Sequence, residues 1–134
     1  MGVDAVAMAA AVLFGVMALF QVALALGVPW GAFAFGGRAV RDDGTLPTAY
    51  RAASALTAVL LVVFAVVILT RGGVIGTSGD STLVTVTSWV IVAFMAINTP
   101  MNLMGKHWIE KYVFGGITLV LVILCAIVAA SGPS

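Results

Sequence analysis

Long apolar stretches alternate with short polar ones along this chain. Four stretches, at 5–27, 52–70, 83–104 and 112–130, are almost entirely apolar. A helix that crosses a bilayer needs about 20 mostly apolar residues, and each stretch is close to that length. Short connections favour antiparallel neighbours. The pattern therefore predicts an all-α polytopic membrane protein, an antiparallel bundle of four transmembrane helices that forms a single membrane domain over 1–134.

The composition strengthens this interpretation. The chain is 63% hydrophobic and 8% charged, whereas an average soluble domain is about 45–50% apolar and about 25% charged. Too few polar residues remain to cover a soluble surface, so the lipid bilayer is the expected surrounding. We expect no nucleic-acid partner. A homo-oligomer or a larger membrane complex is compatible with the pattern.

The first apolar stretch differs from a signal peptide. It follows the opening MGVDAV, which has Asp4 and no Lys or Arg, and it is longer than the usual apolar region of about 7–15 residues. We expect it to be retained as a helix. The single cysteine, Cys125, excludes an internal disulfide and paired-thiol redox chemistry.

The basic residues are distributed unevenly between the connections. Loop 28–51 holds Arg38, Arg41 and Arg51, and loop 105–111 holds Lys106 and Lys111. Loop 71–82, on the other side of the membrane, holds a single Arg. The positive-inside rule then places loops 28–51 and 105–111 in the cytoplasm and both termini outside, in a multi-pass protein of the cell (inner or plasma) membrane.

Small residues predict how the helices pack. Ala7, Ala11 and Gly15 recur every four residues, and such a series lets two helix backbones approach closely in a membrane. Gly115 and Gly116, near the start of the last helix, are expected to admit a neighbour in the same way.

The stretch INTPMNLMGKHWIEK, 97–111, concentrates polar residues in an apolar chain. Asn98 and Asn102 are four apart and share a helical face. Pro100 lacks an N–H and is expected to bend the helix there. The two amides then either satisfy the freed backbone or reach Gln21 of the first helix, which lies at similar depth.

The end of this stretch has two interpretations. Lys106, His107 and Glu110 are spaced for mutual contact if the segment is helical, and Glu110 is also placed to cap the last helix. In that case the residues only end one helix and begin the next. Alternatively, polar side chains in a membrane often mark function. The candidate binding site then comprises Gln21, Asn98, Asn102, His107, Glu110, Arg38 and Arg51, around the cytoplasmic mouth of the bundle.

Neither a metal nor a cofactor is expected. His107 and Glu110 supply two ligands at most, and a catalytic zinc needs three from the protein. The stretch GAFAFGG of the first loop lacks the Lys-Ser/Thr ending of a phosphate loop. The apolar PWGAFAFGG either lies in the membrane interface or folds back into the mouth of the bundle. For Arg51 we favour snorkelling to the interface over an ion pair with Glu110.

The segments LPTAYRAASA and INTPMN, followed by Glu110-Lys111 after a charged turn, resemble small four-helix integral membrane proteins of high-GC bacteria whose function is unknown. The resemblance implies the four-helix fold and no particular activity. Gly105-Lys106-His107-Trp108 departs from the turn of that group, so a shared role for His107 does not follow.

Three functions remain open from the sequence. The first is a non-catalytic membrane protein, either an accessory subunit or a bundle that binds a small ligand. The second is a small oligomeric transporter or channel with a polar path past Gln21, Asn98 and Asn102. The third is an enzyme acting on a lipid, with His107 or Glu110 as acid or base. We predict no catalytic residues for the first two and favour the first.

Overall fold

The computed structural model describes residues 2–133, and every regular element within them is helical. The four long helices are α1 (Val3–Ala25), α2 (Thr48–Arg71), α3 (Thr82–Leu103) and α4 (Gly115–Ser131). A π-helical segment, η3 (Ile109–Phe114), runs directly into α4. The predicted all-α bundle of four helices is confirmed, with each boundary within a few residues of its expected position.

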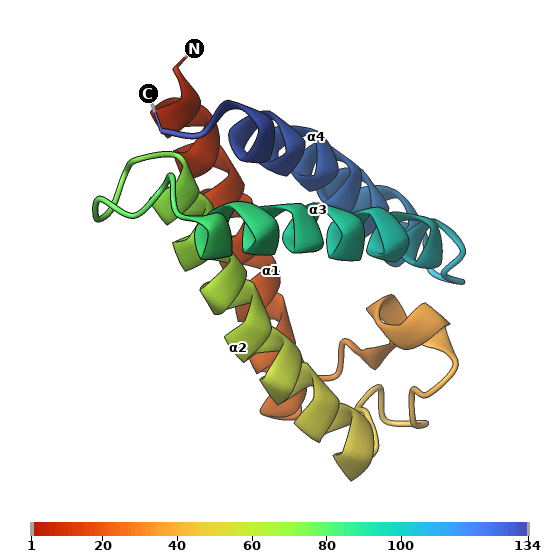
Figure 1. The fold of residues 1–134 in the computed structure, drawn as a ribbon. Helices are drawn as coiled ribbons and strands as arrows, with labels where there is room; N and C mark the ends of the chain where they lie inside the picture. The colour runs from red at the N-terminus through yellow and green to blue at the C-terminus, as the bar shows by residue number, and fades with distance from the viewer. Residues whose placement is uncertain (1, 134) are drawn as a thin grey trace.

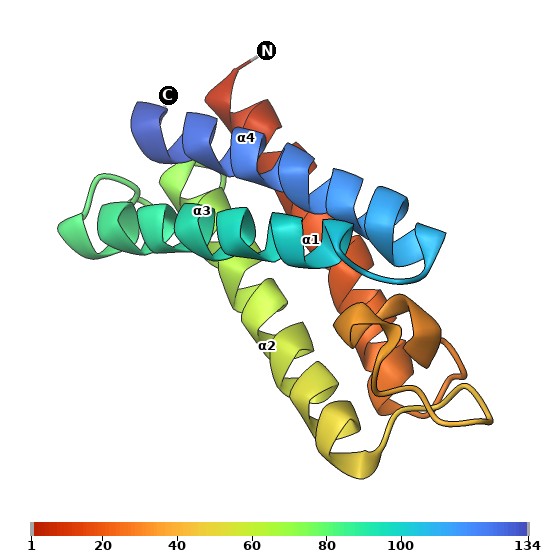
Figure 2. The same cartoon turned by 90° about the vertical axis from the view of Figure 1, so that its right-hand side faces the viewer.

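The helices form two antiparallel hairpins. α1 packs mainly against α2, and α3 packs mainly against α4. Figure 1 shows the two hairpins side by side at the end that carries both chain termini and diverging toward the other end. The view turned by 90° shows the same divergence, with the first connection lying near the wide end (Figure 2). The bundle is therefore tightest near the termini and opens toward the first loop.

Four helices are long and apolar enough to cross a membrane: Val3–Ala25, Thr48–Arg71, Thr82–Leu103 and Ile109–Ser131. Their outward faces carry large apolar side chains that are exposed to the surroundings, among them Leu19, Val59, Val90 and Ile123. In water these faces would be unfavourable, and in lipid they are not. The fold is thus consistent with a multi-pass membrane protein.

The core lies in the narrow half of the bundle. Its large and fully buried side chains come from all four helices, and they are Phe14, Ile68, Ile91, Met95, Leu121, Cys125 and Val128. The ring of Phe14 meets that of Phe64 edge-on, with 6.0 Å between the centroids. A second, smaller cluster joins Leu24 of α1 to Ala34 and Leu46 of the first loop. That cluster anchors the loop to the end of α1.

The expected seam of small residues on α1 is only partly correct. Ala7 is fully buried, but Gly15 is exposed, and a Cβ added to it would meet nothing within 4 Å. The buried face instead continues through Phe14 and Ala18. That face follows the series Val6, Ala10, Phe14 and Ala18, which lies one position before the predicted one, so Gly15 is turned out of the core.

The expectation for Gly115 is confirmed. A Cβ on Gly115 would lie 2.7 Å from a methyl carbon of Leu103, so α3 and α4 approach closely there. Gly116 faces open space instead.

Helix α3 continues without interruption through Pro100 to Leu103. The amide nitrogen of Asn98 donates to the carbonyl oxygen of Phe94, four residues earlier, at 3.0 Å. It therefore does not satisfy the carbonyl of Ala96, which Pro100 leaves without its usual donor, nor does it reach Gln21. The hydroxyl of Thr99 donates to the carbonyl of Met95 in the same way, at 2.9 Å.

Candidate functional site

A cavity of about 680 Å³ lies between the two hairpins at the wide end of the bundle. Binding pockets for small molecules commonly measure about 300–1,000 Å³. The polar or charged side chains that line it are Gln21, Arg38, Tyr50, Thr57, Asn98, Asn102 and Glu110. The fold therefore brings five of the seven predicted site residues to one cavity.

Helical periodicity explains how these residues meet. Gln21 shares a face of α1 with Met17 and Phe20, and all three line the cavity. On α3 the same spacing brings Asn98, Met101 and Asn102 to the cavity. The apolar neighbours of Gln21 and of the two Asn residues were not identified from the sequence. The spacing could have indicated Met17 and Met101, which lie four residues before Gln21 and three after Asn98, but not Phe20, which directly precedes Gln21.

The first loop forms one wall of the cavity. It contains two short 3-10 turns, η1 (Gly31–Phe33) and η2 (Phe35–Gly37). The N–H of Gly36 donates to Oε2 of Glu110 at 3.1 Å, and the carbonyl of Gly36 accepts from the N–H of Lys106 at 3.4 Å. Of the two alternatives for PWGAFAFGG, the loop therefore folds back into the mouth of the bundle.

Glu110 is the most deeply buried acidic residue at the site, with 4% of the residue exposed. It belongs to the π-helical segment, a form of helix that often occurs at functional sites. Oε2 accepts from Gly36, but Oε1 has no hydrogen-bond partner among residues 2–133. Gly105 lies directly against this carboxylate, and a Cβ there would come within 2.7 Å of Cδ. The carboxylate is thus held rigidly with one oxygen unpaired.

Gln21 has a similar feature. Its side-chain oxygen Oε1 is buried and has no hydrogen-bond partner in the described part of the chain. A buried polar atom without a partner costs roughly 1–3 kcal/mol. Both Gln21 and Glu110 line the cavity. The site therefore offers two buried acceptor oxygens that the protein itself leaves unsatisfied.

Glu110 lies in the first turn of η3, where a negative charge is favoured as predicted, but among the described residues the side-chain contacts predicted for it are not formed. Within residues 2–133 it forms no ion pair with Lys106 or Arg51, and no side chain caps the start of its helix. Gly105 and Lys106 lie outside the helices, so Lys106 and Glu110 do not share one continuous helix. The predicted spacing of Lys106 and Glu110 therefore does not produce a contact.

His107 lies beside the cavity and does not line it. Its Nδ1 accepts a hydrogen bond of 3.1 Å from the N–H of Ile109. Its ring packs against Phe33, with 4.4 Å between the centroids. The imidazole thus supports the turn between α3 and η3, and no hydrogen bond joins it to Glu110 in the described residues.

Arg51 also lies outside the cavity lining. Its Nε donates to the carbonyl oxygen of Ala25 at 3.0 Å, at the last residue of α1. A cation is favourable beside the carbonyl end of a helix. Arg51 therefore caps α1 from the neighbouring helix and is not paired with Glu110.

Arg38 is exposed and lines the cavity from the loop. It is the one basic residue among those lining the cavity. The deep part of the site is thus acidic and the loop wall carries a positive charge. No group of three or more His, Cys, Asp or Glu residues within 2–133 is arranged to hold a metal ion.

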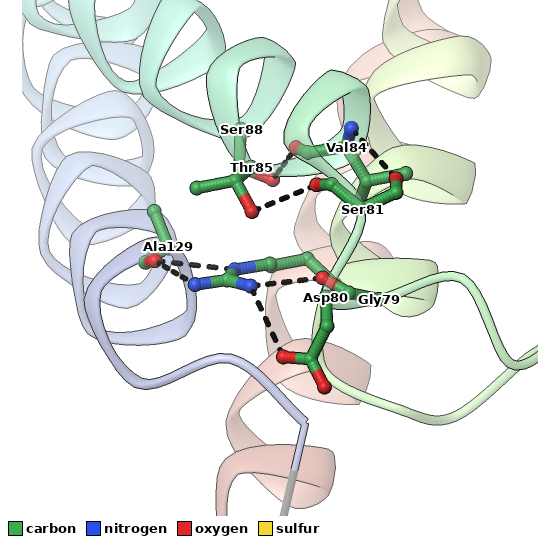
Figure 3. Close-up of polar contacts among 8 residues, drawn as sticks. Gly79, Asp80, Ser81, Val84, Thr85, Ser88 and Ala129 are labelled. Atoms are coloured by element: carbon green, nitrogen blue, oxygen red, sulfur yellow. Dashed lines mark hydrogen bonds and ion pairs between the residues drawn. The ribbon is translucent and has the colours of Figure 1, made fainter.

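From the sequence, Arg71 was assigned to loop 71–82, and this assignment was wrong, because Arg71 is the last residue of α2. Only 8% of Arg71 is exposed. Its Nε and Nη2 donate to the carbonyl of Ala129 at 3.2 and 2.8 Å, and its Nη1 donates to the carbonyl of Gly79 at 2.8 Å. Figure 3 shows these contacts, with Asp80 at 3.9 Å as an ion-pair partner. Arg71 ties the ends of α2 and α4 to the connection before α3.

Helix α3 begins beside this contact, at Thr82, one residue before the expected stretch 83–104. Ser81 is the N-terminal capping residue, and its hydroxyl oxygen accepts from the N–H of Val84 at 3.2 Å (Figure 3). This end of the bundle is held by hydrogen bonds to backbone atoms and carries no cavity-lining residue of the site above.

Comparison of the chain with models of protein families, with curated proteins and with solved structures finds no match. The resemblance to small four-helix proteins of high-GC bacteria therefore remains a prediction from the sequence.

Proposed function

We propose that this chain is a multi-pass protein of the cell membrane that binds a small amphiphilic molecule between its two hairpins, without catalysing a reaction. One observation carries the proposal: the buried Oε1 atoms of Gln21 and Glu110 belong to residues of the same cavity, and neither has a protein donor within residues 2–133. A bound molecule that supplies donors removes the cost of these atoms.

The lining supports an amphiphilic ligand. Most of the cavity wall is apolar or aromatic, with residues such as Met17, Phe20 and Phe114, and a few polar groups converge on it. Sites for small molecules usually combine an apolar wall with a small number of placed polar groups. If the chain is an accessory subunit, the same cavity binds a molecule that belongs to the larger complex.

The orientation that we propose puts both termini outside and the cavity near the cytoplasmic face. Four of the exposed aromatic residues, Trp30, Tyr50, Trp108 and Tyr112, lie in or next to the first loop and η3. Trp and Tyr are favoured at the headgroup level of a bilayer. Arg38 and Arg41 of the first loop, and Lys106 and Lys111 beside it, belong to this same end of the bundle, as the positive-inside rule requires for the cytoplasmic side.

Native mass spectrometry of the protein in nanodiscs tests the proposal. We expect a small noncovalent mass that stays with the chain and is weakened by Gln21→Leu, which removes an unpaired acceptor. Thr87→Val is the control, because the Thr87 hydroxyl bonds only within its own helix, to the carbonyl of Leu83, and lies outside the cavity. A bare chain, in lipid extracts that cover the main membrane lipid classes, would reject the proposal.

A small oligomeric transporter or channel is the second candidate. It is favoured by the convergence of Gln21, Asn98 and Asn102 on one cavity. A continuous path is opposed by the fully buried core toward the termini, where Phe14 and Leu121 lie. Transport would therefore need the hairpins to move apart. Flux in liposomes that falls with Asn98→Leu supports this candidate, and flux equal to that of empty liposomes removes it.

A further inference from the structure

We propose that the head of the ligand is a protonated primary amine, held by Glu110 and Gln21, and that its apolar tail runs out between the hairpins. This inference rests on the proposed function, because it names the chemistry of the molecule that the cavity binds. Three features of the site support it. They are the atoms that lack a hydrogen-bond partner, the atoms that already have one, and the place where the cavity wall meets the outer surface.

The unpaired atoms are acceptors. A carboxylate is an acceptor only, and an amide oxygen is an acceptor as well. Glu110 is 4% exposed, and within residues 2–133 neither its Oε1 nor Oε1 of Gln21 has a protein donor. The complementary group must bring N–H or O–H donors. An ammonium brings three donors on one atom, and Glu110 and Gln21 line the same cavity.

The charge of Glu110 favours an ammonium over a neutral donor. A buried carboxylate is costly unless a cation and hydrogen bonds compensate it. Within residues 2–133 no cationic side chain lies within ion-pair distance of Glu110. Arg38 lines the same cavity but is exposed. The N–H of Gly36 and the more distant charge of Arg38 compensate the carboxylate only in part. A cationic ligand adds to that compensation, and hydrogen bonds between charged partners are the stronger kind.

The carboxylate of Glu110 makes the deep part of the site unfavourable for an anionic head, because like charges repel. The N–H of Gly36 is used by Oε2 of Glu110, and one N–H of the Asn98 amide is used by the carbonyl of Phe94. The second N–H of Asn98 and the amide of Asn102 offer neutral donors only. The positive charge of Arg38 belongs to the exposed loop wall. An anionic group therefore fits best next to Arg38, as the phosphate of an aminophospholipid head would.

The aromatic lining does not favour a quaternary ammonium over a primary one. The rings of Phe20 and Phe114 lie 4.4 Å apart between centroids, and Phe35 meets Tyr50 edge-on at 5.0 Å. These rings pack against one another in pairs and are not arranged as a cage around a cation. A trimethylammonium group would gain some cation–π attraction but has no N–H for the two oxygens.

The tail has a route out of the bundle. Met101 and Met104 line the cavity and are also 63% and 71% exposed on α3. These side chains therefore connect the cavity with the outer surface of the helix. In a bilayer that surface is in contact with lipid, so an alkyl chain can extend from the cavity into the membrane.

Titration of the whole protein with three dodecyl compounds tests the head group. The compounds are dodecylamine, dodecyltrimethylammonium and dodecanol, added to the protein in nanodiscs with bound ligand counted by native mass spectrometry. We expect dodecylamine to bind at least about tenfold more tightly than the other two, since only it pairs both charge and N–H donors with the site. Equal saturable binding of the three compounds overturns the amine inference and leaves the proposed cavity function standing. No saturable binding of any of them overturns both.

Two lysolipids identify the source of the amine. Lysophosphatidylethanolamine and lysophosphatidylcholine of equal chain length differ only in whether the head has N–H groups. Selective binding of the ethanolamine lipid, in addition to dodecylamine, indicates an aminophospholipid. Selective binding of dodecylamine alone indicates a free long-chain amine. Choline lipid binding equal to or tighter than that of the ethanolamine lipid contradicts the inference.

The variant E110Q removes the charge and keeps the shape and the acceptor for Gly36. We expect it to lose most of the preference for dodecylamine over dodecanol. The matched control is D42N, which removes one acidic charge from the same loop end of the bundle but lies outside this cavity. D42N should keep the preference. If both variants lose it equally, general attraction of cations explains the binding and the inference is wrong.

Discussion

The N–H of Gly36 donates a hydrogen bond of 3.1 Å to Oε2 of Glu110, although the two residues are 74 positions apart in the sequence. The bond fastens the first loop to the beginning of the last helix. With the bond from the N–H of Lys106 to the carbonyl of Gly36, it closes one wall of the cavity. The buried carboxylate is therefore one of the contacts that hold this wall in place, together with the cluster of Leu24, Ala34 and Leu46.

Replacing that carboxylate should loosen the loop. Glu110→Ala removes the acceptor for Gly36, and a hydrogen bond to a charged group contributes roughly 1.5–3 kcal/mol, or about tenfold to a hundredfold in the opening of the loop. Trypsin should then cut faster after the exposed Arg38 and Arg41. Timed proteolysis in detergent with mass analysis measures this. Glu110→Gln keeps an acceptor oxygen and is the control. Equal cutting of the unchanged protein and Glu110→Ala would show that the bond does not hold the loop.

Gly105 should tolerate no larger side chain. A Cβ there would meet Cδ and Cγ of Glu110 at 2.7 and 2.9 Å, in a part of the chain that is buried. Gly105→Ala should therefore lower the free energy of unfolding by about 1–3 kcal/mol, as overpacking commonly does. Gly116→Ala is the matched control, since nothing lies within 4 Å of its added Cβ. Thermal unfolding of both variants in one detergent compares them, and similar losses would contradict the close contact at Gly105.

Arg71 should be the most important charged residue for stability at the narrow end. Arg71→Leu leaves the carbonyls of Ala129 and Gly79 without their donors, and we expect a loss on the order of 3 kcal/mol. Arg71→Lys should recover part of it, because an ammonium can still donate to one of the carbonyls. Denaturation followed by circular dichroism measures the difference.

The control for Arg71 is its ion-pair partner. The side chain of Asp80 is 90% exposed, and exposed ion pairs contribute roughly 0–1 kcal/mol. Asp80→Asn should therefore have little effect. A loss in Asp80→Asn as large as that in Arg71→Leu would mean that the ion pair, and not the two carbonyls, stabilises this end.

The proposed orientation leads to a test with fused reporters. Both termini should lie outside, so a C-terminal alkaline phosphatase fusion should be active and a C-terminal fluorescent protein that folds only in the cytoplasm should be dark. The same pair of reporters fused after residue 42, within the first loop, should give the opposite result. A bright C-terminal fluorescent fusion would reverse the proposed topology.

Asp43 in the first loop should titrate at unusually low pH. The hydroxyl and the N–H of Thr45 both donate to Oδ1 of Asp43, and they lower the pKa of its carboxyl below the usual value. The ionised form is therefore favoured in the folded loop. Its small stabilising contribution is present above the ordinary aspartate pKa of about 3.9 and is lost as the pH falls through the lowered value.

Thr45→Val removes the hydroxyl donor and should raise the pKa of Asp43 toward its ordinary value, while the backbone donor remains. Carboxyl-carbon NMR titration of Asp43 measures the change. Thr48→Val, at the exposed start of α2, is the control and should leave the titration of Asp43 as it is. An identical titration in both variants would show that the Thr45 hydroxyl does not set this pKa.

Part of the site could be predicted from the sequence because polar residues in an apolar chain are few. Gln21, Asn98 and Asn102 had to share a region of the bundle, since each lies on an apolar helix at similar depth. Their partners could not be predicted in the same way. Local spacing suggested Lys106 for Glu110, but the partner is the N–H of Gly36, which no spacing rule connects to it.

Arg71 and Gly15, whose burial was predicted wrongly, show the same limit of local sequence patterns. Arg71 follows an apolar helix and precedes two glycines, so by sequence it resembles a loop charge. Its burial depends on α4 ending beside it, where the carbonyl of Ala129 is free to accept. Gly15 continues a regular series of small residues, yet it faces outward, because the buried face of α1 runs one position earlier, through Ala10, Phe14 and Ala18.

The sequence alone determined the number of helices and their approximate ends. These depend on apolar length and local hydrogen bonds, which are encoded within a few neighbouring residues. Only the tertiary structure decided that the hairpins diverge, that the first loop folds into the gap, and that Oε1 of Glu110 and of Gln21 remain unpaired. Those features arise from contacts between segments far apart in the chain, where the choice of partner depends on how the helices pack together.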